Sequence, residues 1–192
     1  MDTTEHPRSK LLVRSRIHED ENLTAYRNRI AQENGMNGYC LAFGKPGKNY
    51  QKKIDSIQKI AILTGQSFEC LMERAYLDLV TQMPYVSWCG KVVSRKMLRN
   101  NPPLCLACID EYGYIRSFWD LKMVVACPRH RCWLLEKCPS CNNTITWERI
   151  KGIRCLCGCR SGWFDASSGV TNEAVALSVL AEKAFGLESE FP

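Results

Sequence analysis

Apolar residues recur at helical spacing in four stretches of the chain, which favours a largely α-helical fold outside its cysteine-rich part. The first stretch begins after Asn22, a residue suited to cap a helix, and ends at Asn34-Gly35. Before it, residues 1–21 mix apolar and basic side chains and resemble an extended arm. We therefore expect an arm that leads into a helix.

A Thr-Gly turn separates the second and third stretches. The second predicts a helix that ends near Thr64-Gly65, and Ser67 then caps a helix with one apolar stripe, at Phe68, Leu71, Met72, Ala75 and Leu79. Helix, turn and helix in this order resemble a DNA-binding helix-turn-helix. Helical hairpins are also common in other α domains, and Glu69 and Glu73 would bring negative charge towards phosphate. Direct base reading is therefore the weaker interpretation.

The fourth stretch predicts a C-terminal helix. Thr171 is suited to cap it, Gly186 to end it after Phe185, and its apolar residues are expected to pack on the body, at Val175, Val179, Leu180 and Ala184. Between the helical part and the cysteines, the segment from Met83-Pro84 to Asn101-Pro102-Pro103 is expected to be a basic linker.

Nine of the twelve cysteines and one histidine are crowded into residues 105–159. Eight of these ten residues form four pairs, and two thiolates separated by two residues can offer two tetrahedral ligands to one cation. Four pairs suffice for two closed zinc sites, which leave no position for water and so indicate a scaffold. Pairing neighbours keeps each loop short. It predicts one zinc ion at Cys105, Cys108, Cys127 and His130, and a second at Cys138, Cys141, Cys155 and Cys157.

Several alternatives stay open for the cysteines. Cys159 could replace Cys155 or Cys157, and Cys132 could substitute in the first site, although a buried spare thiol is the simpler interpretation. Disulfides or an iron–sulfur cluster are the other uses. The polar N-terminus has no secretion signal and no run approaches the ~18 apolar residues of a membrane span, so we expect a reducing, cytoplasmic location. The isolated cysteines are expected in the core, at Cys40, Cys70 and Cys89.

The formal net charge of +6 is unevenly distributed. Five acidic residues and one lysine follow residue 160, so the preceding part carries +10. Grouped cations attract phosphate, and we expect nucleic-acid contact at two clusters, Lys45, Lys48, Lys52 and Lys53, and Lys91, Arg95, Lys96 and Arg99. A third cluster comprises Arg149, Lys151, Arg154 and Arg160. Solvated surface patches would have the same composition.

The sequence contains no motif typical of an enzyme. A phosphate-binding glycine loop, His-Glu-x-x-His and a nucleophile elbow are all missing. A zinc deaminase would need His-x-Glu or Cys-x-Glu before its Pro-Cys-x-x-Cys, and Cys138-Pro-Ser-Cys141 lacks this element. We expect neither catalysis nor a small-molecule substrate.

The order of several motifs resembles the TniQ/TnsD transposition proteins. The carriers are Leu12-Val13-Arg14, Asp20-Glu21-Asn22-Leu23 with Tyr26, Arg29-Ile30-Ala31, Asn34-Gly35, Pro103-Leu-Cys105-Leu-Ala-Cys108, Arg116, Trp119, Cys127-Pro-Arg-His130, Leu134-Leu135, Cys138-Pro-Ser-Cys141 and Cys155-Leu-Cys157-Gly158. Asn22 stands where the family usually has Ser, Asn142 where Gly is usual, and Cys159 is an extra thiol. Members that read DNA themselves carry long C-terminal extensions, so this chain is similar to the short TniQ form of CRISPR-associated transposons.

This resemblance implies a non-catalytic adaptor that links an RNA-guided CRISPR effector to the AAA+ ATPase regulator of a transposase, close to DNA or RNA and away from membranes. On this view Arg116 and Trp119 are packing residues. The arm is the candidate ATPase-docking segment, through Leu11, Leu12, Val13, Arg14, Arg16 and Ile17.

The expected fold class is a mainly α N-terminal domain with a helix-turn-helix-like hairpin, then a small zinc-binding domain with two zinc fingers, and a C-terminal helix. The expected divisions are the arm at 1–21, the helical domain at 22–100, the tandem zinc fingers at 101–165, and the C-terminal helix with its acidic tail at 166–192. Two other functions remain open: a direct sequence-specific DNA-binding targeting protein or transcription factor, and a structural zinc module of an unrelated assembly.

Overall fold

The computed structural model describes residues 10–36, 50–77, 84–147, 149–151, 154–155, 157–158 and 169–186. Its helices are α1 (Leu23–Glu33), α3 (Tyr50–Thr64), α4 (Phe68–Glu73), α5 (Leu106–Tyr112) and α6 (Asn172–Ala184). Three antiparallel hairpins pair β1 (Tyr85–Trp88) with β2 (Lys91–Ser94), β3 (Ala126–Cys127) with β4 (Cys132–Trp133), and β5 (Ile150–Lys151) with β6 (Arg154–Cys155). Short 3-10 turns lie at Arg95–Met97 and Ser117–Asp120.

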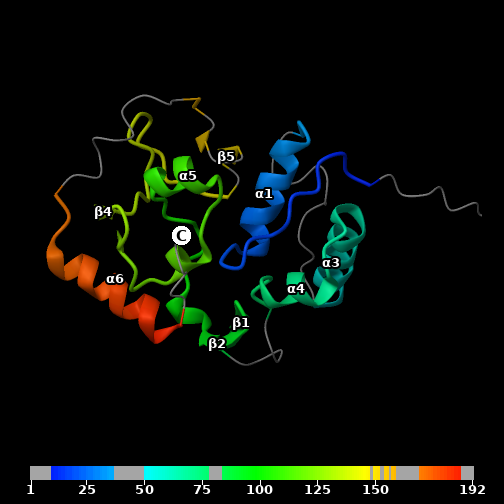
Figure 1. Cartoon of the computed structure of the whole chain (residues 1–192), viewed down its shortest axis with the longest axis horizontal. Helices are drawn as coiled ribbons and strands as arrows, with labels where there is room; N and C mark the ends of the chain where they lie inside the picture. The colour runs from blue at the N-terminus through cyan, green and yellow to red at the C-terminus, as the bar shows by residue number, and fades with distance from the viewer. Residues whose placement is uncertain are drawn as a thin grey trace, which may run out of the picture.

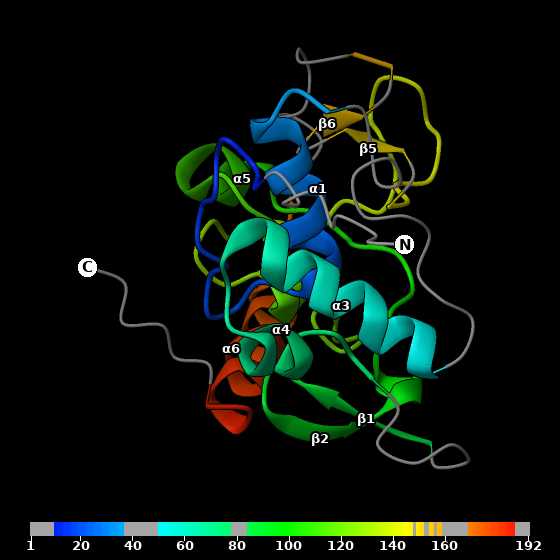
Figure 2. The same cartoon turned by 90° about the vertical axis from the view of Figure 1, so that its right-hand side faces the viewer.

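Helix α1 lies at the centre of the molecule. Asn22 caps it by accepting a hydrogen bond from the Ala25 amide at 2.8 Å, and it ends at Asn34, followed by Gly35 with φ of 68°. Figure 1 shows α1 between α3 and α4 on one side and the cysteine-rich region, residues 101–158, on the other. In Figure 2, α3 crosses in front of it. Because both sides are covered, most of its side chains are buried, including charged ones.

The α3–α4 hairpin has the predicted turn, but its second helix is shorter than predicted. Ser67 caps α4 and accepts from the Cys70 amide, yet the helix ends at Glu73 and does not continue towards Leu79. Two contacts outside the hairpin explain the early end. The Arg74 carbonyl accepts a hydrogen bond from the Leu23 amide at 2.9 Å, and Tyr76, at a φ of 52°, donates to the Asp120 carboxylate at 2.7 Å.

The expected linker before the cysteines is instead the β1–β2 hairpin. Its turn is Cys89-Gly90, with φ of 47° and 74°, and its buried residues join the core of the cysteine-rich region, namely Val86, Trp88 and Val93. A separate core unites α1, α3 and α4, at Leu23, Tyr26, Ile30, Ile57, Ile60, Leu71 and Leu77. The expected domain boundary at residue 100 stays a prediction.

Helix α6 forms as predicted, with Thr171 as its cap and Gly186 after its end. The predicted packing face was partly wrong. Val175 is buried against β3, but Leu180 is 61% exposed and Ala184 is exposed. The buried stripe is instead Ala174, Val175, Ser178 and Ala181. This stripe packs on β3 at Ala126, and Glu182, also on α6, pairs with Arg116 of the cysteine-rich region at 3.4 Å.

Buried polar contacts join the arm and α1 to the cysteine-rich region. Arg116 is 2% exposed and pairs with Asp20 as well as Glu182. The side-chain amide of Asn22 also donates to the Asp120 carboxylate at 2.6 Å.

No helix in the described ranges has the length and apolar character to cross a membrane.

Candidate metal centres

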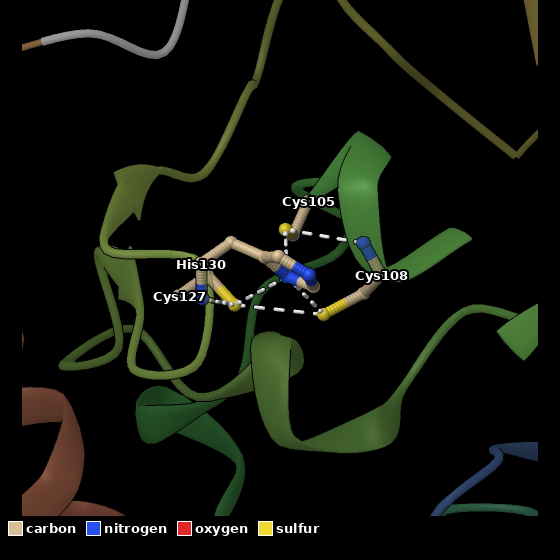
Figure 3. Close-up of side chains that lie close together, drawn as sticks. All are labelled: Cys105, Cys108, Cys127 and His130. Carbon is tan, nitrogen blue, oxygen red and sulfur yellow. Dashed lines mark hydrogen bonds between the residues drawn. The ribbon is translucent and has the colours of Figure 1, made fainter. Parts of the chain in front are cut away.

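The first cluster, site 1, consists of Cys105, Cys108, Cys127 and His130. Cys105 is the N-cap of α5, and Cys108 lies in the first turn of that helix. Cys127 ends β3, and His130 follows in the turn that leads to β4. Figure 3 shows the four side chains pointing towards one another, two from each segment.

The spacing of these atoms matches a tetrahedral metal site. Zn–S bonds of about 2.3 Å and Zn–N bonds of about 2.05 Å place tetrahedral ligand atoms roughly 3.6–3.8 Å apart. The Cys108 and Cys127 sulfurs are 3.5 Å apart. His130 Nδ1 lies 3.5, 3.2 and 3.7 Å from the sulfurs of Cys105, Cys108 and Cys127. The donor set therefore fits one ion of zinc's size.

Backbone turns hold both halves of site 1 in place. The Cys108 amide donates to Cys105 Sγ at 3.5 Å, and the His130 amide donates to Cys127 Sγ at 3.4 Å. Amide donors stabilise thiolates, which are the form that binds metal. Arg131 follows with φ of 47°, so the chain turns back immediately after the last ligand.

Crowding of the thiols also changes their pKa values. The hydrogen bond with Cys108 lowers the pKa of Cys105 to about 7. Hydrogen bonds with Cys105 and Cys108 lower the pKa of Cys127. Hydrogen bonds with Cys105 and Cys127 raise the pKa of Cys108. A divalent cation binds the deprotonated thiolates, so metal binding at this site would release these protons to solvent.

A carboxylate supports the histidine from outside. His130 Nε2 lies 3.2 Å from Glu111 Oε2, and Glu111 is also paired with Arg129. A carboxylate on the far nitrogen fixes the histidine tautomer and leaves Nδ1 for the metal. Glu111 was not predicted from the sequence, although it follows the ligand Cys108 by only three residues.

The second cluster, site 2, consists of Cys138, Cys141, Cys155 and Cys157. The Cys138–Cys157 and Cys141–Cys155 sulfur pairs are 3.7 and 3.8 Å apart, again close to a tetrahedral edge. Hydrogen bonds led by the Asn143 amide lower the pKa of Cys141 to about 6. The structure thus brings together all eight predicted ligands in the two predicted sets of four. Cys159 lies outside the described residues.

Asn142 explains one departure from the family pattern. It follows Cys141 with φ of 54°, in the left-handed region that glycine adopts without penalty and asparagine tolerates. Asparagine can therefore stand where glycine is usual without changing the turn.

Comparison with known families identifies the chain. The TniQ family model matches residues 12–134, more than half of the 192 residues. The chain belongs to the TniQ family. No curated protein matches it. TniQ proteins are transposition proteins known as non-catalytic, so membership implies partners in the transposition machinery and interaction with nucleic acid. The match includes all of site 1 and ends before site 2.

The arm of this TniQ protein is anchored at one face. Leu11 and Ile17 pack on the core of α1, α3 and α4, and the Leu11 amide donates to the Leu63 carbonyl at 3.1 Å. The Asn34 side chain binds both the amide and the carbonyl of Val13, each at 2.9 Å. The remaining candidate docking residues are exposed, at Leu12, Val13, Arg14 and Arg16.

The candidate nucleic-acid residues are placed unequally. Lys52 is exposed on α3 and Lys53 is half-buried, whereas Lys45 and Lys48 lie outside the described residues. In the second cluster Lys91, Arg95 and Lys96 are exposed.

Arg99 has a role inside the fold. Its guanidinium donates to the carbonyls of Leu121 and Val124 and pairs with Glu136 at 3.3 Å. It therefore positions the backbone of the cysteine-rich region, and we do not retain it as a nucleic-acid contact.

The third cluster is only partly described. Arg149 is half-buried, whereas the side chains of Lys151 and Arg154 and all of Arg160 lie outside the described part of the chain.

Of the single cysteines expected in the core, Cys89 packs against the core of the cysteine-rich region, whereas Cys70 belongs to no core cluster of the described residues. Cys70 and Cys89 are only half-buried. Cys70 contacts Arg74 Nη1 at 3.2 Å, and Cys89 lies 3.1 Å from Ser117 Oγ. Cys40 lies outside the described residues.

Proposed function

We propose that this TniQ protein is a non-catalytic adaptor in target-site selection, linking an RNA-guided CRISPR effector to the AAA+ ATPase regulator of the transposase. The observation that carries the proposal is the arm. Its backbone is fixed to the helical core, while the Leu12 side chain is 97% exposed. Its neighbour Val13 is 40% exposed, and we take this exposed apolar pair on a fixed backbone as the docking surface.

The charge and position of the arm support a protein partner. Arg14 and Arg16 are exposed beside Leu12, so the arm offers an apolar anchor with cations around it. Such a segment suits an apolar pocket with an acidic rim, because the anchor supplies burial and the cations supply orientation.

Replacing the anchor tests the docking role. Burial of one leucine contributes about 1.5–3 kcal/mol, so Leu12→Asp should weaken binding to the ATPase, assembled on DNA with nucleotide, by roughly 10- to 100-fold. The control is Ile62→Asp, the same change at an exposed apolar residue outside the arm, on α3. Unchanged binding by Leu12→Asp would place the interface elsewhere.

Two zinc ions are part of the proposal. One set of three thiolates with an imidazole and one of four thiolates, both at tetrahedral spacing, are typical of structural zinc. We expect two zinc ions for each purified chain by elemental analysis. Cys138→Ser should remove one ion, and Cys89→Ser should remove none. A wild-type chain without zinc would contradict this assignment.

Exposed cations support contact with a nucleic-acid backbone next to the partner proteins. Lys91 and Lys96 lie in one short segment, on β2 and in the 3-10 turn that follows. Each phosphate contact makes binding more sensitive to salt. Lys91→Glu with Lys96→Glu should therefore weaken assembly on the guide-RNA complex and flatten its dependence on salt. The same changes at Lys59 and Lys183 are the control.

Direct DNA reading is the competing function, and α4 argues against it. This helix has six residues, and Glu69 and Glu73 are exposed on it. Their charges would oppose phosphate. The ATPase experiment decides between the two functions when DNA alone is included. Tight, sequence-selective binding to DNA alone, lost on mutation of α4, would replace the adaptor proposal.

A further inference from the structure

A fifth thiol lies beside site 1. Cys132 is 8% exposed, and its sulfur is 3.6 Å from the sulfur of Cys105. Two sulfurs that bind one zinc ion in a tetrahedron are about 3.8 Å apart. The Cys132 sulfur is therefore as close to Cys105 as a second ligand would be, although it lies outside the group of four donor atoms that are all within 4.8 Å of one another, so it would have to shift to bind the same ion.

The β3–β4 hairpin brings this thiol to the site. Cys132 is paired directly with Cys127 across the two strands, and side chains of directly paired residues lie on the same face of a sheet. Cys105 reaches the same place from the N-terminus of α5. Two separate elements thus hold the three sulfurs together, and both belong to the frame of site 1.

The histidine of site 1 is more exposed than this thiol. The His130 side chain is 24% exposed, and the Glu111 side chain that supports it is 38% exposed. Cys132 is almost fully buried. Of the candidate donors around site 1, the imidazole is therefore the one that solvent or a partner reaches most readily.

We infer that Cys132 is a reserve ligand of site 1. Cys105, Cys108 and Cys127 hold the ion together with His130, and Cys132 takes the fourth position when the imidazole leaves. The Cys132 thiol gives its proton to solvent as its sulfur binds, and the neutral imidazole becomes free. The ligand charge changes from −3 to −4 without oxidation or reduction. Both ligand sets are standard for structural zinc.

This inference rests on the proposal that site 1 holds zinc, and the test separates the two. We would measure the zinc content and the zinc affinity by chelator competition for wild type, His130→Ala, Cys132→Ser and the double variant. His130→Ala should retain two zinc ions. The double variant should bind zinc at site 1 about 100-fold more weakly than His130→Ala. This factor corresponds to about a quarter of the binding free energy of a structural zinc site, because one of its four ligands is lost. Cys132→Ser alone should bind as wild type.

Cobalt(II) in place of zinc reports the donors directly. Thiolate-to-cobalt absorption should increase in His130→Ala relative to wild type, because a fourth thiolate replaces nitrogen, and the increase should vanish in the double variant. His130→Ala combined with Cys89→Ser is the control for loss of an unrelated thiol, and it should keep the increase.

Three outcomes would overturn the inference. If the double variant binds zinc as tightly as His130→Ala, water or another group fills the fourth position. Loss of zinc or of folding in His130→Ala would mean that Cys132 does not replace the histidine. A wild-type chain with fewer than two zinc ions would refute the two-zinc proposal itself, and this inference with it.

Discussion

Asp120 is a buried carboxyl whose ionisation should destabilise the fold. Its Oδ2 atom accepts hydrogen bonds from the side-chain amide of Asn22 at 2.6 Å and from the Tyr76 hydroxyl at 2.7 Å. Burial outweighs these two bonds and the nearby charge of Arg99, and it raises the pKa of Asp120 from 3.8 to about 7. The carboxyl is therefore largely protonated in the folded chain just below neutral pH, whereas it is ionised in the unfolded chain.

The direction of the pH dependence follows from this difference. Between pH 3.8 and about 7 the folded state holds a proton that the unfolded state has lost, so stability falls as the pH rises. The contribution of Asp120 is fully present below the lower value and is lost once the pH exceeds the higher one. For a folded pKa of 7, we expect a loss of about 1.4 kcal/mol between pH 6 and pH 8.

Asp120→Asn isolates this contribution. The amide oxygen can accept both hydrogen bonds but cannot ionise, so the variant should not show the loss. Urea unfolding in excess zinc at pH 6, 7 and 8 should show the variant gaining about 1.4 kcal/mol relative to wild type across the range. Asp55→Asn, a change at an exposed carboxylate on α3, should give a constant difference.

Neighbouring groups do not mimic the effect. The pKa of Tyr76 is well above 10 and that of Cys89 is about 11, both raised mainly by burial, so neither titrates between pH 6 and 8. Other groups with altered pKa values, such as Glu21 and Glu182, are common to both proteins. A wild-type minus variant difference that does not change with pH would refute the reasoning, because it would mean that Asp120 keeps one protonation state throughout.

Three further changes test the buried polar contacts and the metal frame. Arg116→Met should destabilise the fold by about 3–5 kcal/mol, since it leaves the carboxylates of Asp20 and Glu182 buried without their cation; urea unfolding measures it. Glu111→Ala should weaken metal binding at site 1 by roughly 10- to 100-fold, because His130 loses its support; chelator competition measures it. Asn142→Ala should destabilise site 2 by about 1–2 kcal/mol because of its left-handed backbone, and Asn142→Gly should not; zinc-dependent melting compares them.

Each of these changes has a matched control. Lys96→Met removes an exposed cation and should change stability by less than 0.5 kcal/mol or so; an equal effect of Arg116→Met would contradict its bridging role. Asp110→Ala alters the exposed neighbour of Glu111 on the same helix and should leave the affinity unchanged. Equal melting of the alanine and glycine variants at position 142 would show that the turn carries no backbone strain.

Helix starts were predictable because their cause is local. Asn22, Ser67 and Thr171 each accept a hydrogen bond from the amide three residues later, which is a property of the residue and its immediate neighbours. The ligand pairs were predictable for the same reason, since paired cysteines bind as short units. Both the helix caps and the ligand pairs could be predicted because the residues that form them are close together in the sequence.

The missed features depend on residues far apart in the chain. The end of α4 depends on a partner of Arg74 at Leu23 and a partner of Tyr76 at Asp120. The buried face of α6 depends on β3, where Ala126 packs with Ala174 and Val175 and its amide donates to the Ser178 hydroxyl, 52 residues away. By contrast, the β1–β2 hairpin could have been predicted, because Val86 and Trp88 alternate with polar residues and Cys89-Gly90 supplies the turn.

Under the adaptor proposal, these long-range contacts would give the metal sites a role in docking. Site 1 fixes the start of α5, and the segment that follows this helix carries Arg116 and Asp120. Arg116 holds Asp20, at the end of the arm, and Asp120 holds Asn22, the cap of α1. The arm is thus attached to the cysteine-rich region by buried polar bonds, which require accurate positions because an unpaired buried charge is strongly destabilising. A metal that orders α5 would therefore also order the base of the arm, and under the adaptor proposal this is how a structural metal site would determine how the exposed Leu12 is presented.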